Sequence, residues 1–498
     1  MLVIGVDCST TAAKAVAWDA WGASVAEGRS AFALDSPAPG AWEQDAEAWW
    51  TATRFAIAEC VHALGSRSTE IRALCLTHQR ETFVLTDPSS KPLHPATVWM
   101  DSRGVEQVER AKHRVGAQRL RQISGKPPCV TPSLYKLMAL FERRPELVAQ
   151  RPRVLDVHAF LCWRLTGRFA TSLASADPLG LIDMARRAWA PELCALAELD
   201  EAQLPELVEP GVQLGELDRA VAATIGLPPG LPVIAGAGDG QAAGLGAGIV
   251  SADRAYLNLG TAIVSGVASS TYSVGDAFRT LYGAAPGTFF LETDLKGGTF
   301  TLNWLAERVL GARDPTQKLA ELEQGAAALP AGAEGLLLVP YWNGVMNPYW
   351  DDTATGVLVG LTGRHGPAHL HRAVLEGIAF EQRLHTHGVE AAIGTPITEM
   401  VVMGGGAKSA LWCQIISDAL QKPVVRARAA EATALGAGML AAVGGGLYPD
   451  LAAAAAGMTG TGDRFTPGPN AARYDTLFAI YQQLFPSLRA PLRALASL

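Results

Sequence analysis

The chain has 498 residues, of which 49% are apolar and 18% charged, and this composition excludes disorder over most of its length. Forty-one Lys and Arg residues against 48 Asp and Glu residues give a net charge of −7 without a long basic run, so we expect no nucleic-acid partner. At about 100–200 residues per domain, the length predicts roughly two to four domains. The 51 glycines, many beside Thr, Ser or Asp, indicate backbone that approaches a ligand closely.

Cysteine usage and the N-terminus indicate the compartment. The seven cysteines are odd in number and never form a C-x-x-C pair, so we expect neither a disulfide framework nor a zinc site, and a reducing cytoplasm. The first apolar run lacks a preceding positive charge and is interrupted at Asp7, which is atypical of a signal peptide. Glycine interrupts the later apolar windows before the about 20 residues that a membrane span needs, so we expect no membrane association. The sequence leaves the oligomeric state open, with a homodimer among the alternatives.

The first half of the chain begins with a predicted β-hairpin. Apolar runs at residues 2–6 and 12–18 flank a turn of small polar residues at 7–11. The pattern then predicts, in chain order, a helix at 45–65, strands at 71–77, 82–86 and 95–98, and a strand at 231–235 that leads through Gly236, Gly238 and Gly240 into a helix from Gln241.

The second half repeats this design. Strands at 255–259 and 263–267 flank the turn Gly260-Thr261, so a hairpin with a small-residue turn occurs once in each half. The remaining pattern predicts a strand at 399–403, helices at 408–421 and around 452–456, a strand at 424–426, a loop at 459–470 and an amphipathic C-terminal helix. We therefore predict two duplicated α/β domains, 1–248 and 249–498, with a cleft between them and the boundary near Gly248.

Both hairpin turns carry the parts of a phosphate site. Such a site needs backbone N–H groups next to small residues, hydroxyl donors and a carboxylate for an accompanying Mg²⁺. The first turn supplies Asp7, Thr10 and Thr11, and the second supplies Gly260 and Thr261. Either turn alone reads as an ordinary hairpin turn. Neither a P-loop nor a complete dinucleotide-binding glycine pattern occurs in the sequence.

Asp239 is the carboxylate whose surroundings point most clearly to chemistry. It follows an apolar strand and lies between glycines at a predicted strand-to-helix turn. An aspartate in this place is either a helix N-cap or a catalytic base, and a base at the start of a helix stays ionised, as a proton acceptor must be.

The segment from His78 to Thr82 resembles a wall for binding a polyol. It contains His78, Gln79, Arg80 and Glu81, and Trp99 and Asp101 follow the next predicted strand. A guanidinium and a carboxylate can bracket vicinal hydroxyls, and an aromatic face can cover the C–H surface. The structural alternatives are a surface ion pair between Arg80 and Glu81, a core tryptophan and a buried structural histidine.

Taken together, these segments resemble the FGGY family of carbohydrate kinases, which belongs to the actin-like (ribonuclease H-like) ATPase superfamily. The most specific stretch runs from Gly356 through Gly360-Leu361 and His369-Leu370 to Glu376 and meets a family pattern at every constrained position. A second stretch, Gly404 to Asp418 with Glu431 and Gly436-Ala437 after it, resembles the family's adenosine-binding segment. The resemblance covers about residues 3–445.

The resemblance implies roles for individual residues. Asp239 would be the catalytic base, Asp7 would help to hold Mg²⁺, and ATP would be the phosphoryl donor. Closure of the cleft about a hinge near residue 248 would exclude water. The expected ATP contacts are Thr10, Thr11, Lys14, Gly260, Thr261, Gly404, Gly405 and Ala407, and the expected substrate contacts are His78, Gln79, Arg80, Glu81, Trp99, Asp101, Asp239 and Gln241.

Departures from the family patterns bear on the substrate. Ala139 stands where the family's K-x-x-W motif has tryptophan. Gln79-Arg80-Glu81-Thr82 resembles the glycerol-kinase branch, whereas Trp99-Met100-Asp101-Ser102-Arg103 resembles the W-N-D-G-R of xylulokinases. We therefore expect a small ketose or polyol, with a pentulose such as xylulose favoured and glycerol or erythritol as alternatives.

Two functions of other classes fit the same fold, because fold does not dictate activity. A non-catalytic sugar or nucleotide sensor would need neither a base at Asp239 nor a metal carboxylate at Asp7. An actin-like filament former would not need Arg80, Glu81 and Trp99 together. The presence of all five residues favours the kinase.

Overall fold

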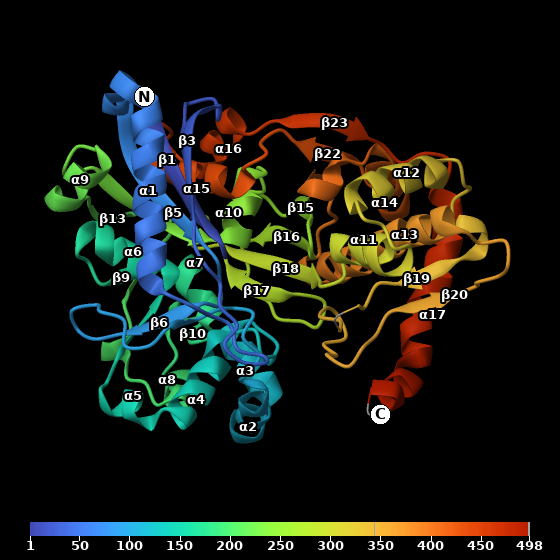
Figure 1. Ribbon diagram of the computed structural model, residues 1–498, viewed down its shortest axis with the longest axis horizontal. Coiled ribbons are helices and arrows are strands. Elements are labelled where there is room, and N and C mark those ends of the chain that lie inside the picture. The colour runs from blue at the N-terminus through green and yellow to red at the C-terminus, as the bar shows by residue number, and fades with distance from the viewer. Residues whose placement is uncertain (343, 497–498) are drawn as a thin grey trace.

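The computed structural model describes residues 1–342 and 344–496, and its two largest sheets lie one in each half of the chain (Figure 1). The first sheet has the strand order β13-β14-β5-β1-β2-β3. Its strands are β13 (Gln213–Glu216), β14 (Pro232–Gly238), β5 (Ile71–His78), β1 (Leu2–Cys8), β2 (Ala12–Trp18) and β3 (Ser24–Ala31). β5 runs parallel to β1 and to β14, and the other neighbours are antiparallel.

The second sheet has the strand order β17-β18-β16-β15-β21-β22-β23. Its strands are β17 (Arg279–Tyr282), β18 (Phe289–Leu295), β16 (Ile263–Ser269), β15 (Arg254–Leu259), β21 (Glu399–Met403), β22 (Val424–Ala427) and β23 (Thr461–Phe465). β15, β21 and β22 are parallel, and the flanking pairs are antiparallel. The order β18-β16-β15-β21-β22-β23 repeats β3-β2-β1-β5-β14-β13 with the same directions, so the predicted duplication is confirmed.

Helices cover both faces of each sheet. On the first sheet, α1 (Ala46–Leu64) and α6 (Val157–Thr166) pack with one face. α13 (Pro367–Ile393) and α14 (Ala410–Leu420) occupy the corresponding face of the second sheet. The remaining larger helices of these layers are α9 (Arg219–Ile225), α11 (Thr299–Trp304), α12 (Pro315–Ala327), α16 (Leu451–Met458) and α17 (Ala471–Ala496).

The two halves exchange one helix each at their junction. α10 (Asp239–Gly246) follows the first sheet but packs on Tyr256, Phe290 and Val401 of the second. α15 (Ala432–Gly444) follows the second sheet but packs on β1, β5 and β14 of the first. The two helices contact each other between the sheets (Figure 1), so the residues at their N-terminal ends lie where the two halves meet.

Smaller elements surround the first sheet. A four-stranded sheet is formed by β4 (Glu43–Gln44), β7 (Ala96–Thr97), β6 (Phe83–Thr86) and β8 (Arg153–Asp156). The helices of this region are α2 (Val105–Val115), α3 (Ala117–Ser124), α4 (Ser133–Arg143), α5 (Pro145–Ala149), α7 (Leu173–Ala176) and α8 (Pro191–Cys194). Short strand pairs are β9 (Ala170–Ser172) with β12 (Glu206–Val208), β10 (Ile182–Asp183) with β11 (Ala188–Trp189), and, in the second half, β19 (Leu337–Val339) with β20 (Val357–Val359).

The predicted loop at 459–470 is wrong in part. Residues Thr461–Phe465 form β23, which pairs with β22 at the edge of the second sheet. The strand is mostly exposed and contains Gly and Asp, so it lacks the apolar alternation on which strand prediction depends. None of the helices in the described part of the chain combines the length and apolarity needed to cross a bilayer.

Candidate functional site

Asp239 lies at the junction of the halves, where β14 ends and α10 begins. It is the first residue of the helix, and Gly238 occupies the N-cap position, so the interpretation of Asp239 as an N-cap is wrong. Its Oδ1 accepts a hydrogen bond from the N–H of Gly240 (2.7 Å) and forms an ion pair with Arg80 Nε (2.8 Å). The side chain is 41% exposed, so a ligand can reach the carboxylate.

Gly238 and Gly240 leave space for Arg80. A Cβ atom on Gly238 would lie 2.5 Å from Arg80 Cγ, and one on Gly240 would lie 2.6 Å from Glu292 Oε2. In the structure these glycines let a buried guanidinium from β5's C-terminal end lie against the aspartate.

Arg80 and Glu81 do not form the surface ion pair of the structural alternative. Both are buried, and each pairs with a residue of the second half: Arg80 Nη1 with Glu292 Oε2 (2.9 Å) and Glu81 Oε1 with Arg279 Nη1 (2.9 Å). Glu81 has a φ of 51°, in the left-handed region that residues other than glycine rarely adopt. Such strained residues cluster at functional sites, and here the strain accompanies a carboxylate turned toward the junction.

We call the segment His78–Thr82 together with Trp99 the acceptor wall, and Lys136 fixes its backbone. Its ammonium is buried and donates to three carbonyl oxygens, those of Glu81 (3.1 Å), Trp99 (2.9 Å) and Thr131 (2.7 Å). Burial lowers the pKa of Lys136 from 10.5 to about 8, although the Glu81 and Asp101 carboxylates oppose the shift. Lys136 belongs to the K-x-x-W-like segment, in which Ala139 is buried within the core.

Trp99 is not a core tryptophan, because it is 42% exposed. Its indole Nε1 donates to the Oγ1 of Thr10 in the first hairpin turn (3.0 Å), and its backbone N–H donates to Thr82 Oγ1 (3.1 Å). The exposed ring therefore joins the predicted acceptor wall to the first predicted phosphate turn.

The other predicted substrate residues are almost fully buried. His78 lies with its ring 6.0 Å from that of His158, and its buried Nε2 has no hydrogen-bond partner. Asp101 accepts from Arg103 Nε (2.8 Å), as a structural residue would. Gln79 donates to Gln44 Oε1 (2.8 Å), and Gln241 donates to the carbonyl of Ala174 (3.0 Å). Contact of these four side chains with a substrate stays a prediction.

Asp7, at the C-terminal end of β1, has the properties of a carboxylate that is suited to binding a cation. Burial, followed by repulsion from Asp239 and Glu431, raises the pKa of Asp7 to about 8. Its buried Oδ1 has no hydrogen-bond partner. A divalent cation would stabilise the ionised form, so the residue fits the expected Mg²⁺ contact. Within residues 1–342 and 344–496 no three metal-binding side chains are grouped, so further ligands would have to come from water or phosphate oxygens.

Lys14 on β2 connects the first hairpin to the second half. Its ammonium pairs with Glu27 (2.9 Å) and with Glu431 (3.0 Å), the residue before α15. Burial opposes its ionisation, but these two glutamates outweigh the burial and raise the pKa of Lys14. In the second hairpin, the carbonyls of Gly260 and Thr261 accept from the N–H groups of Thr299 and Phe300.

The predicted adenosine segment lines an open hollow of ≈ 560 Å³ in the second half. Gly404 has a φ of 84°, and a Cβ there would lie 2.4 Å from Asn258 Oδ1, so only glycine fits without strain. The lining combines the predicted Gly404, Gly405 and Ala407 with Lys408 and the segment 426–430. The two glycines leave part of this lining without side chains, so a ligand can approach the backbone closely there.

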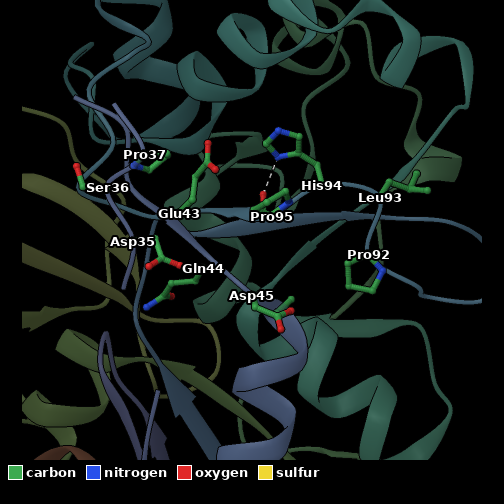
Figure 2. Close-up of a pocket in the computed structure, with 11 residues that line it drawn as sticks. Asp35, Ser36, Pro37, Glu43, Gln44, Asp45, Pro92, Leu93, His94 and Pro95 are labelled. Atoms are coloured by element: carbon green, nitrogen blue, oxygen red, sulfur yellow. Dashed lines mark hydrogen bonds between the residues drawn. The ribbon is translucent and has the colours of Figure 1, made fainter. Parts of the chain in front are cut away.

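A further hollow, of ≈ 700 Å³, opens on the first half away from these residues (Figure 2). Residues 35–37, 43–46 and 92–95 line it, and His94 Nδ1 lies 2.8 Å from the carbonyl of Pro95. Its link to the site is Gln44, which contacts Gln79 and the Thr10 carbonyl from the buried side.

Arg279 and Glu292 are the site residues that the sequence reasoning missed. Both are buried charged residues within strands β17 and β18. Glu292 directly follows the apolar run Phe289–Leu291, and this position was a usable signal. A charge in an apolar strand indicates a partner of opposite charge, because an unpaired charge is rarely buried.

Comparison with known proteins shows the family to which the chain is similar. The model of the FGGY family of carbohydrate kinases, N-terminal domain, matches residues 2–246, and that of the C-terminal domain matches residues 255–445. The chain is 29% identical over 490 residues to a xylulose kinase of Bacillus subtilis, covering 97% of this chain and 96% of the relative. It is 32% identical over 466 residues to a glycerol kinase of Citrifermentans bemidjiense, covering 91% and 92%. The crystal structure of xylulose kinase from Rhodospirillum rubrum superposes with a TM-score of 0.93 at 29% identity, covering 99% of this chain and 100% of that one.

Proposed function

The chain belongs to the FGGY family of carbohydrate kinases, and we propose that it transfers the γ-phosphoryl group of ATP to a terminal hydroxyl of a small ketose or polyol. A pentulose such as xylulose is the favoured acceptor, and glycerol or erythritol is the alternative. The family makes the protein a carbohydrate kinase that uses ATP, so neither the sensor nor the filament former is retained. The observation that carries the proposal is the ion pair of Arg80 with the exposed Asp239 at the junction of the two halves.

In this proposal Asp239 accepts the proton of the acceptor hydroxyl. Arg80 and Gly240 both contact Oδ1, and Oδ2 is the atom that we expect to face the hydroxyl. The guanidinium orients the carboxylate toward the acceptor, and a general base must lie within hydrogen-bond reach of the proton that it accepts. Arg80 and Glu81 would bracket the acceptor, with Trp99 against its C–H face.

ATP would supply the transferable phosphoryl group, with Mg²⁺ to offset its charge. Asp7 would hold the cation, directly or through water. Lys14, Thr10, Thr11, Gly260 and Thr261 would bind phosphates, which would replace Glu27 or Glu431 as the partner of Lys14. The segment with Gly404, Gly405 and Ala407 would border the adenosine. Residues 1–248 would thus bind the acceptor and contribute to the phosphate site, and residues 249–498 would bind the rest of the nucleotide.

The experiment is steady-state phosphorylation of D-xylulose, L-xylulose, D-ribulose, glycerol and erythritol with coupled detection of ADP. We expect acceptor-dependent ADP formation with at least one of them and the highest kcat/KM with a pentulose. A higher kcat/KM with glycerol or erythritol would replace the pentulose by the polyol alternative. ADP formation that no acceptor in the panel accelerates would refute the proposal.

A further inference from the structure

Alternating charges from both halves of the chain converge on Asp239. We call Glu81, Arg279, Glu292 and Arg80 the charge chain, because consecutive members are paired in this order. Arg279 donates from Nη1 to Glu81 (2.9 Å) and from Nε to Glu292 Oε1 (2.7 Å). Arg80 donates from Nη1 to Glu292 (3.1 and 2.9 Å) and reaches Asp239 Oδ1 through Nε (2.8 Å).

The charge chain is buried throughout. Glu292 is 0% exposed, and the other three members are less than a tenth exposed. Burial opposes the ionisation of Glu292, but Arg279 and Arg80 outweigh it and hold the pKa of its carboxyl below the ordinary value. Buried ion pairs contribute little net stability compared with apolar packing, so the charge chain is weak evidence for a purely stabilising role.

The partners of Arg80 and Glu81 in the charge chain come from the second half of the chain. Glu292 comes from β18 and Arg279 from β17, whereas Arg80 and Glu81 directly follow Gln79 at the C-terminal end of β5. The carboxylate of Glu292 lies close to both Arg80 and Gly240. A Cβ atom on Gly240 would come within 2.6 Å of Glu292 Oε2. Without this carboxylate the guanidinium would lose the partner that holds it beside Asp239.

We propose that Glu292 and Arg279 are positioning residues of the acceptor subsite, which set the places of Arg80 and Glu81 and restrict the acceptor to neutral sugars or polyols. This inference rests on the proposed function. Each guanidinium of the charge chain is already shared by two carboxylates, so neither offers a free cation to a carboxylate on the substrate. A sugar acid brought to this place would add a further negative charge, which is unfavourable at low dielectric.

The test compares Glu292→Gln and Arg279→Met with a control, Glu376→Gln. Glu376 is also a buried glutamate bound to an arginine, with Arg372 Nε 2.8 Å away, but it lies within α13. We expect Glu292→Gln to raise the acceptor KM at least tenfold while the ATP KM changes less than twofold. Arg279→Met should also raise the acceptor KM. The control should lower the melting temperature and leave both KM values within twofold. Gluconate, as an anionic probe, should not be phosphorylated by the wild type.

The outcomes separate this inference from the proposed function. Wild-type turnover of a neutral acceptor with an unchanged acceptor KM in folded Glu292→Gln would overturn the positioning role alone. Efficient phosphorylation of gluconate by the wild type would overturn the restriction to neutral acceptors. Absence of turnover with every acceptor would overturn the proposed function, and the acceptor role with it. If Glu292→Gln does not fold, Glu292→Asp, which keeps the charge but shortens the reach, should still raise the acceptor KM.

Discussion

Lys136→Met tests whether one buried ammonium holds the acceptor wall together. The substitution removes three hydrogen bonds, to the carbonyls of Glu81, Trp99 and Thr131, and keeps most of the side-chain volume. Hydrogen bonds to a charged group contribute roughly 1.5–3 kcal/mol each, so the loss of three is roughly 4.5–9 kcal/mol. The fall in the pKa of Lys136 from 10.5 to about 8 corresponds to an unfavourable burial of about 3 kcal/mol, which the methionine avoids. A net destabilisation of a few kcal/mol follows.

The pH dependence of this effect has a defined sign. Because the folded-state pKa is lower than the unfolded one, the cost of the buried charge is fully present below pH 8 and disappears above about 10.5. The difference in unfolding free energy between the wild type and Lys136→Met should therefore grow as the pH rises through this interval. Measuring the difference between the two proteins cancels the titration of other groups that they share.

Urea unfolding at several pH values and the acceptor KM are the measurements. We expect Lys136→Met to raise the acceptor KM more than the ATP KM, because the freed carbonyls belong to Glu81 and Trp99. Lys422→Met is the control, since Lys422 pairs with Glu390 at a partly exposed position and its loss should cost less than about 1 kcal/mol. A Lys136→Met protein as stable as the wild type, with an unchanged acceptor KM, would refute the reasoning.

Asp7→Asn should raise at least tenfold the Mg²⁺ concentration needed for half-maximal turnover. In the wild type this concentration should fall as the pH rises toward 8, because the cation must displace the proton of a carboxyl whose pKa is raised to about 8; a pH-independent requirement would contradict the role. Gly404→Ala should lower thermal stability and raise the ATP KM, because its Cβ would clash with Asn258 at a positive φ. Gly405→Ala should raise only the ATP KM, because its Cβ meets no protein atom within 4 Å; an unchanged ATP KM would remove Gly405 from the nucleotide site.

Local sequence patterns were enough to predict the two hairpins and their duplication. The strands at 2–6 and 12–18 are present as β1 and β2, and the strand at 399–403 matches β21 at both ends. These segments are apolar because both faces of each sheet are covered by helices, so the signal is strong. The edge strand β23 escaped prediction because it lacks that apolar signal and is defined by its pairing with β22.

The partners within the site could not be predicted from local patterns. The sequence placed Arg80 and Glu81 side by side in a predicted polyol-binding segment and left a surface ion pair between them as the structural alternative. In the structure their partners Glu292 and Arg279 are about 200 residues away, and the helix exchange at the junction of the halves brings them together. The position of Asp239 within one residue of a helix N-cap was likewise ambiguous, because capping depends on backbone geometry that the glycines leave undetermined.

The most direct test of the account compares ATP binding with phosphoryl transfer in Asp239→Asn. The asparagine keeps the size of the side chain but cannot accept a proton, and Asp239 lies outside the hollow that Gly404 and Gly405 border. We expect an ATP dissociation constant within about threefold of the wild type by calorimetry, and a fall of at least ~100-fold in kcat for the best acceptor, in line with the usual contribution of a general base. Retention of most of the wild-type kcat would contradict the central claim that Asp239 is the base.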